Sequence, residues 1–138
     1  EERAIAQQAV RTGSMYITSE VRYADNLTLT GTYPANYDQF NYIYSDGTSI
    51  IHQTSSEQIK ILDGTIDGID YDLSFTEAVT DAYSGYSVLL QFNLSAEDIY
   101  ALESNVLVLN IVLPEKFSNE MNEGQQAPVI KYTKPVSP

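Results

Sequence analysis

The first 25 residues carry apolar side chains at helical spacing. The members of one stripe are separated by steps of four, three, four, four and three residues, which fits the 3.6-residue period of an α-helix. Polar side chains such as Gln8, Arg11 and Glu20 fall mostly outside this stripe. The pattern predicts one long helix whose buried face consists of Ala6, Val10, Gly13, Ile17, Val21 and Ala24.

The predicted helix has no N-cap within the sequence. A helix that starts inside a folded chain usually carries Ser, Thr, Asp or Asn at that position, whereas this one opens with Glu1, Glu2 and Arg3. Glutamates favour the positive end of a helix dipole, which accounts for the charges but not for the missing cap. We therefore expect the helix to continue a segment upstream of Glu1.

After the helix, apolar and polar side chains alternate with a period of two, which is typical of half-buried strands. The dipeptide Asp46-Gly47 links two such runs and predicts a type I′ hairpin turn, with φ > 0 at both residues. Residues 76–85 are polar and predict a loop. The expected strands cover residues 27–32, 40–45, 48–52, 58–62, 69–75 and 87–94.

The end of the chain is less regular. Residues 105–113 are almost continuously apolar, which predicts a central strand buried on both faces. Pro114 ends that strand, and the polar residues 115–126 fit a short helix or a surface loop. Residues 127–138 hold three of the five prolines, so we expect an extended tail or an edge strand there.

Length and composition fit a single globular domain spanning residues 1–138. A chain of 138 residues with 43% hydrophobic and 19% charged residues is long enough to close one core. No apolar run reaches the roughly 20 residues that span a bilayer. With no cysteine, a disulfide framework and a thiolate metal site are excluded. We expect an α+β domain with a helix over residues 1–26, an antiparallel sheet over 27–113, and a C-terminal loop and tail over 114–138.

The net charge of −12 is unevenly distributed. Residues 38–103 contain twelve acidic residues and one base, Lys60. Three of the seven basic residues, Arg3, Arg11 and Arg22, belong to the predicted helix. A nucleic-acid surface needs clustered Lys and Arg to displace phosphate counterions, so we expect no direct binding of nucleic acid.

The sequence contains no catalytic motif. Its single histidine, His52, has no Ser or Cys nucleophile motif nearby, and a catalytic triad needs a nucleophile, a base and an orienting acid. We therefore interpret His52 as a structural residue at a sheet edge, and we expect neither enzymatic activity nor an organic cofactor.

A cluster of acidic residues gives a candidate calcium site at Asp63, Asp67, Asp70 and Asp72. Calcium takes six to eight oxygen ligands, and carboxylates around glycine turns can supply them, although this spacing does not match an EF-hand. Asp-Gly pairs also form turns without a metal, and alternation alone places Asp70 and Asp72 on the outer side of a strand. Both interpretations remain open.

Tyrosine is abundant in this chain, with eleven residues. Tyrosine rings are frequent at sugar and protein contact surfaces, and they are also common in ordinary strands. The tyrosines that could form such a surface are Tyr33, Tyr37, Tyr42, Tyr44, Tyr83 and Tyr86.

Several segments resemble type IV pilins and the pseudopilins of type II secretion, minor pilins in particular. Residues 11–26 resemble the second half of the pilin helix, and residues 42–50 (YIYSDGTSI), 69–75 and 106–110 resemble the pilin strands. The resemblance covers most of the chain and implies a pilin-like fold, with one long N-terminal helix packed on an antiparallel sheet. The processed leader and the apolar half-helix that define the family are not in the sequence, so no functional residue is carried over.

The resemblance implies a non-enzymatic structural subunit. A missing N-terminal segment would hold it in the membrane before assembly, and other pilin or pseudopilin subunits would then pack with it in a surface filament of the cell envelope. The absence of cysteines departs from pilins that close their C-terminal loop with a disulfide. The alternative function is a free-standing secreted binding module that recognises a glycan or a protein through tyrosine-rich strands.

Overall fold

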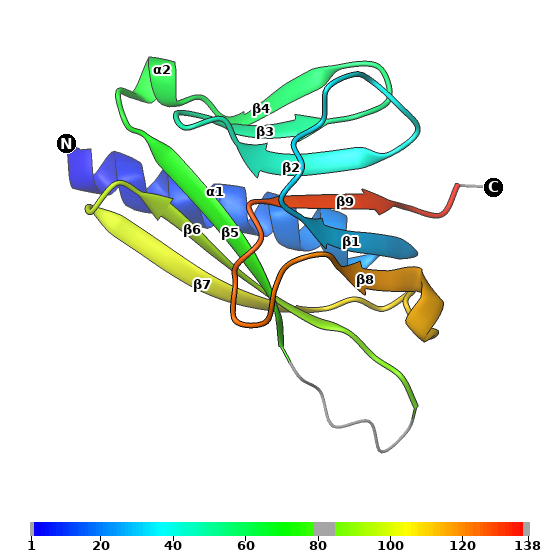
Figure 1. Ribbon diagram of the computed structural model, residues 1–138. Helices are drawn as coiled ribbons and strands as arrows, with labels where there is room; N and C mark the ends of the chain where they lie inside the picture. Colours follow the sequence, from blue (N-terminus) through cyan, green and yellow to red (C-terminus); the bar gives the residue numbers. More distant parts are fainter. Residues whose placement is uncertain (1, 79–84, 137–138) are drawn as a thin grey trace.

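The computed structural model describes residues 2–78 and 85–136, and within them one long helix lies along two β-sheets (Figure 1). The helix is α1 (Glu2–Arg22). The larger sheet has the strand order β4-β3-β2-β9-β1-β8, and the smaller one has the order β5-β6-β7. None of the described helices is long and apolar enough to cross a membrane.

The strands of the larger sheet are β1 (Asn26–Thr30), β2 (Asn41–Ser45), β3 (Ile50–Gln53), β4 (Gln58–Leu62), β8 (Phe117–Asn119) and β9 (Val129–Thr133). Those of the smaller sheet are β5 (Tyr71–Ala78), β6 (Leu89–Ala96) and β7 (Tyr100–Leu107). Two short helices complete the fold, α2 (Gly64–Asp67) and the 3-10 turn η1 (Pro114–Lys116).

The predicted stripe faces the interior, since Ala6, Val10, Gly13, Ile17 and Val21 of α1 and Ala24 after it are all buried. The helix expected over residues 1–26 ends earlier, at Arg22, because the chain turns into β1 at Asn26. Gly13 sits at a close approach of the helix to both sheets. A Cβ atom at Gly13 would lie 3.0 Å from Leu62 of β4 and 3.0 Å from Leu94 of β6. The stripe therefore binds the helix to both sheets, and the α+β architecture expected from the sequence is confirmed.

The expectation of a single antiparallel sheet is wrong in two respects. The strands form two sheets, and β1 pairs in parallel with β8, with Leu27 opposite Phe117. Parallel neighbours need a long crossover, and here the chain passes through the entire smaller sheet between β1 and β8. Sequence periodicity reports which face of a strand is buried, but it carries no information about such distant pairing.

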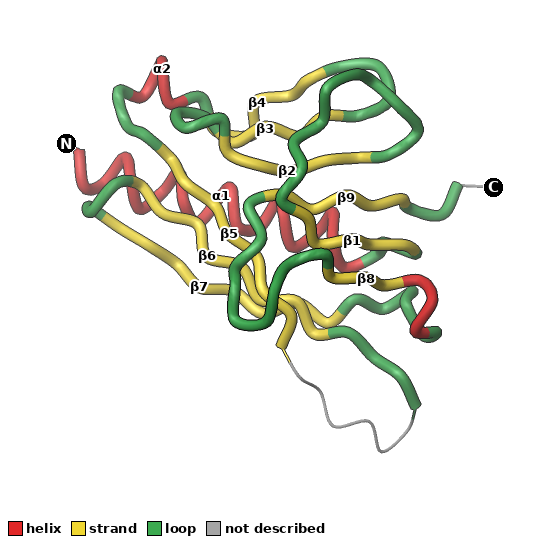
Figure 2. The backbone as a smooth tube through the Cα atoms, in the orientation of Figure 1, coloured by secondary structure: helices red, strands yellow, loops and turns green. Residues whose placement is uncertain are grey.

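The C-terminal segment is an interior strand, which corrects the prediction of a tail or an edge strand. β9 lies between β2 and β1 and pairs antiparallel with both, as the tube in Figure 2 also shows. Pro128 and Pro135 flank this strand and do not interrupt it. Every residue of β9 therefore keeps the backbone N–H that a central strand needs.

The apolar run at residues 105–113 is not a central strand buried on both faces. It begins within β7, which forms one edge of the smaller sheet. Val106, Val108 and Ile111 point inward, whereas Leu107 and Leu109 are exposed. The run is continuous because one apolar series faces the core and a second faces solvent.

The hairpin between β2 and β3 is present, but its turn differs from the predicted type I′. Ser45 pairs with Ile50, so residues 46–49 form the connection, and only Gly47 has a positive φ, of 99°. The Asp46 carboxylate accepts hydrogen bonds from the backbone N–H groups of Thr48 and Ser49, at 2.9 and 2.7 Å. Asp46 therefore shapes the turn with its side chain rather than with a left-handed backbone.

The alternation at β5 and β6 is confirmed. The predicted inward residues of the two strands are buried, namely Ile69, Tyr71, Leu73, Phe75, Val88, Leu90, Phe92 and Leu94. β5 continues to Ala78, into the predicted loop over residues 76–85, and residues 79–84 lie outside the described part of the chain. Where the sequence predicts a short helix or a loop over residues 115–126, the chain completes the short 3-10 helix η1, which begins at Pro114, and then forms the strand β8.

Candidate functional site

The outward face of α1 borders an open groove. A groove of about 490 Å³ runs between α1 and β7. Met15, which lines it, has 72% of its surface exposed. The Arg11 guanidinium lies 5.8 Å from the centre of the Tyr100 ring, which holds one positive charge at the rim. The groove is lined by Arg11, Ser14, Met15, Thr18, Ser19, Arg22, Leu102 and Ser104.

The opposite face of α1 meets the larger sheet through a buried polar cluster centred on His52. The Tyr16 hydroxyl lies 2.7 Å from His52 Nδ1, and Asn41 Oδ1 lies 2.9 Å from His52 Nε2. The amide oxygen can only accept, so Nε2 carries the proton and Nδ1 accepts from Tyr16. His52 lies in β3, inside the sheet, which corrects its assignment to a sheet edge. Ile50 and His52 share one strand face, so alternation alone could have revealed its burial.

Glu20 ties the same helix to the C-terminal strand. Its carboxylate accepts a hydrogen bond of 2.6 Å from the Tyr132 hydroxyl and one of 2.8 Å from the Lys134 ammonium. The nearer carboxylate oxygen is 3.6 Å from His52 Nε2. The helix, β3 and β9 are therefore joined by one connected set of polar side chains.

Burial and hydrogen bonding shift the titration of this cluster. Burial lowers the pKa of His52, and the nearby Glu20 charge opposes this only in part. For Glu20, burial acts to raise the pKa, but hydrogen bonds from Lys134 and Tyr132 outweigh it and the pKa is lowered. Burial and the Glu20 charge raise the pKa of Tyr132 far above its usual range. At neutral pH the cluster thus contains a neutral histidine beside an ionised glutamate.

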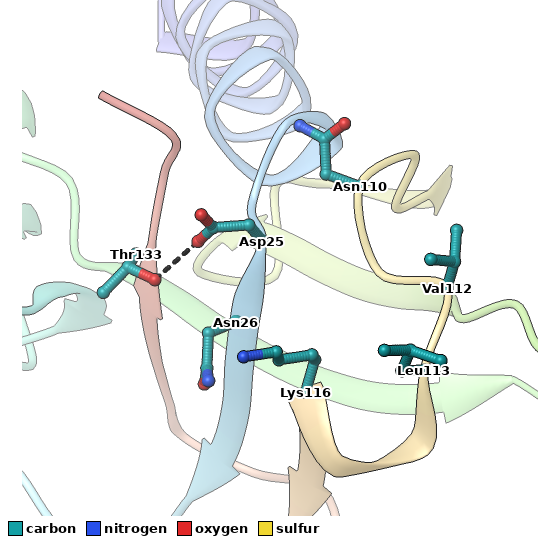
Figure 3. A pocket seen from close by; sticks show the side chains of 7 residues that line it. All are labelled: Asp25, Asn26, Asn110, Val112, Leu113, Lys116 and Thr133. Atoms are coloured by element: carbon teal, nitrogen blue, oxygen red, sulfur yellow. Dashed lines mark hydrogen bonds between the residues drawn. The ribbon is translucent and has the colours of Figure 1, made fainter. Parts of the chain in front are cut away.

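A second pocket, of about 270 Å³, lies where α1 passes into β1 (Figure 3). Thr133 Oγ1 donates a 2.6 Å hydrogen bond to Asp25, whose own N–H donates to the Thr133 carbonyl at 3.0 Å. Asn110 donates to the Tyr23 carbonyl at 2.9 Å, and Lys116 extends toward Asn26. These contacts fasten the end of the helix to β9 and to the segment after β7, so the pocket is a structural junction.

The four aspartates of the calcium hypothesis are not assembled into one site. Asp63 caps α2 by accepting from the N–H groups of Thr65 and Ile66, and Asp67 accepts from the Tyr71 hydroxyl at 2.7 Å. Asp70 and Asp72 are exposed. Among residues 2–78 and 85–136, no group of three or more acidic, histidine or cysteine residues could hold a metal. Calcium binding remains a hypothesis, and a rise in melting temperature with added Ca²⁺ would support it.

The tyrosines of the predicted contact surface differ in exposure, because some are buried and others face solvent. Tyr42 and Tyr44 are buried under residues 31–40 on the outer face of the larger sheet, and Tyr33 and Tyr37 are exposed there. Tyr86 is half-buried near the smaller sheet, and Tyr83 lies outside the described residues. Only part of the predicted set therefore shares one surface.

Comparisons with known proteins identify the fold. No protein-family model matches the sequence, and no curated protein matches it either. The PilB minor pilin from Streptococcus sanguinis superimposes with a TM-score of 0.71 and 17% identity over 100% of this chain, and a point mutant of that pilin gives 0.69 and 17%. This chain spans 36% of the length of each of those chains. The long helix on its two sheets is therefore a pilin-like fold.

Proposed function

We propose that this chain is the globular part of a minor pilin or pseudopilin, a structural subunit of a type IV pilus or of a related secretion filament. The observation that carries the proposal is the match of the whole chain to the fold of a minor pilin. A sequence identity of 17% indicates the fold alone. The assembly contacts proposed below therefore rest on the surface of this chain.

The outward face of α1 is the surface best suited to filament contacts. The six residues of the apolar stripe are buried within the subunit, so they cannot contact a neighbour. Ile5 and Met15 are exposed on the same helix, and Tyr23 is exposed directly after its end. An exposed apolar series along a rigid helix is typical of a protein contact surface. We propose that neighbouring subunits pack against this face.

The proposal includes a membrane-bound stage before assembly. We propose that a segment of about 20 apolar residues upstream of Glu1 continues α1 and anchors the subunit in the bilayer. The assembled subunit would then be part of a surface filament of the cell envelope. Its role would be structural and would require neither catalysis nor direct contact with nucleic acid.

Cysteine crosslinking in assembled filaments tests this function. The chain has no native cysteine, so a single introduced thiol reports one position. In the full-length protein, we expect Met15→Cys carrying a thiol-attached photocrosslinker to form crosslinks with neighbouring subunits in filaments sheared from cells. Tyr37→Cys is the matched control, because Tyr37 is also exposed but lies on the outer face of the larger sheet, away from α1.

The outcome separates filament function from the alternative. A free-standing binding module would be recovered from the medium without filaments, and neither cysteine variant would crosslink. Recovery of the protein in filaments with crosslinks only at Tyr37→Cys would retain the filament role and reject the helix face as the contact surface.

A further inference from the structure

The outer face of the larger sheet holds a pocket that the filament role does not explain. Its volume is about 330 Å³, which is within the range of small-ligand sites. The pocket lies on the side of the sheet away from α1, between residues 31–35 and the strands beneath them. We call it the tyrosine pocket, and it is lined by Thr30, Thr32, Tyr33, Pro34, Ala35, Tyr42, Glu120 and Lys131.

The floor of the tyrosine pocket is held by hydrogen bonds. The buried Thr30 hydroxyl donates to Glu120 Oε1 at 2.6 Å and accepts from the Thr32 N–H at 3.0 Å. The Glu120 N–H donates to the Leu29 carbonyl at 2.9 Å. Glu120 is thus held by two hydrogen bonds, one from its backbone N–H and one to its carboxylate. Its second oxygen has no partner among the described residues, so it can accept from a ligand hydroxyl.

One wall of the pocket is aromatic. The Tyr33 ring stands at 90° to Tyr44, with 5.6 Å between ring centres, and half of its surface is exposed. Tyr42 donates its hydroxyl proton to Asp38 at 2.6 Å, and burial together with this bond raises the Tyr42 pKa to about 12. Tyr42 therefore stays neutral, and its oxygen can still accept a hydrogen bond.

Lys131 supplies the donor side of the pocket. Its ammonium lies 4.2 Å from the centre of the Phe40 ring, a cation–π contact that holds the side chain over the sheet. No carboxylate of the described chain is within ion-pair distance of this ammonium. Its three N–H donors are therefore available to a ligand.

From this arrangement we propose that the tyrosine pocket binds a neutral saccharide. A sugar ring presents an apolar face to an aromatic ring and hydroxyls to fixed acceptors and donors, which here are Tyr33, Glu120 and Lys131. A negatively charged sugar fits less well, because Glu120 and Asp38 lie at the pocket and the chain carries a net charge of −12. The proposal is independent of filament assembly, since all of these groups belong to one subunit.

The test is a titration of the ¹⁵N-labelled 138-residue chain with single neutral sugars, followed by NMR. The probes are glucose, galactose, mannose, N-acetylglucosamine and lactose, with sialyllactose as the acidic comparison. One sugar ring makes few contacts, so we expect a dissociation constant of about a millimolar. At least one neutral sugar should shift the amide signals of Thr32, Tyr33 and Lys131, and sialyllactose should bind more weakly than lactose.

Two exposed tyrosines provide a matched pair of variants. Tyr33 and Tyr37 have 50% and 53% of their surface exposed, but only Tyr33 lines the pocket. We expect Tyr33→Ala to weaken binding at least tenfold, Tyr33→Phe to retain it within threefold because the ring remains, and Tyr37→Ala to leave it unchanged. Glu120→Gln should weaken binding several-fold while the amide oxygen still accepts from Thr30.

Three results would overturn the proposal. The first is the absence of shifts at the pocket with every neutral sugar at tens of millimolar, far above the expected dissociation constant. The second is an equal loss of binding in Tyr33→Ala and Tyr37→Ala. The third is tighter binding of a peptide than of any sugar at these residues, which would identify a protein-recognition surface. Crosslinking of filaments through Met15→Cys is unaffected by each of these results, so failure here leaves the proposed function standing.

Discussion

Helix α1 is fixed to the two sheets by different kinds of contact. Against the smaller sheet the buried contact is apolar, since Gly13 lets the helix backbone approach Leu94 and the Arg11 contact with the Tyr100 ring lies at the rim. Against the larger sheet the helix also uses polar groups, with Tyr16 bonded to His52 and Glu20 bonded to Tyr132. One attachment depends on shape and the other on protonation, so the two should respond to different perturbations.

The contact between Gly13 and Leu94 contains no titratable group, so its strength should not change with pH. The polar attachment contains the only histidine of the chain. Buried polar groups stabilise a fold only while each keeps its partner. The comparison therefore predicts large, pH-independent losses from changes at Leu94 and Gly13, and smaller, pH-dependent losses at Glu20 and His52.

The largest effect is expected for Leu94→Ala. This substitution opens a cavity at a fully buried position beneath the helix, and it should lower the free energy of unfolding by about 3 kcal/mol. Chemical denaturation at pH 7 and at pH 5.5 should give the same loss. Leu107→Ala is the control, because Leu107 is 46% exposed in the same sheet, and a change within about 0.5 kcal/mol is expected.

Gly13→Val is expected to cost about 2 kcal/mol. Its Cβ alone would be 3.0 Å from both Leu62 and Leu94, so a branched side chain forces the helix away from the two sheets. Thr12→Val places the same side chain at an exposed neighbouring position and should change stability little. If Gly13→Val proved as stable as the parent, the close approach would not be needed for packing.

Glu20→Ala is expected to cost about 1.5 kcal/mol. The buried Tyr132 hydroxyl would lose its acceptor, and the Lys134 ammonium would lose its partner. Glu20→Gln keeps an oxygen for Tyr132 and should recover part of the loss. Equal losses in the two variants would show that charge, rather than the hydrogen bond, matters at this position.

The smallest effect is the dependence of stability on pH through His52. Because the folded pKa lies below the unfolded value, the unfolded chain binds more protons, and stability falls as pH drops below about 6.5. One proton limits the slope to about 1.4 kcal/mol per pH unit. Between pH 7.5 and 5.5, the stability of the parent should rise with pH by no more than this limit, and the dependence should be lost in His52→Gln.

Glu20 affects the stability of the fold at lower pH than His52 does. Its folded pKa is lowered, so its contribution is complete above the ordinary glutamate pKa and is lost as pH falls through the folded value. The chain has a single histidine, so a slope that persisted between pH 7.5 and 5.5 in His52→Gln would have to come from another group. That result would contradict the division between the two attachments.

The sequence by itself determined features that depend on neighbouring residues. The stripe from Ala6 to Ala24 and the alternation at Ile69, Tyr71 and Leu73 are local periodicities, and the structure buries these residues as predicted. The long amphipathic helix followed by strands indicated an α+β architecture. The pilin-like form of that architecture was expected only from the resemblance of several segments to pilins. For the tyrosine pocket, the sequence showed only that tyrosine is abundant, because periodicity does not place Tyr33 beside Glu120.

Tertiary structure alone decided the features that depend on distant pairing. β9 inserts between β2 and β1, β8 pairs in parallel with β1, and the apolar run at residues 105–113 begins in β7, an edge strand. His52 became a buried partner of Tyr16 for the same reason, because its neighbours come from α1, β2 and β9. Local sequence sets the face that each strand buries, whereas the order of strands follows from the packing of the whole chain around one helix.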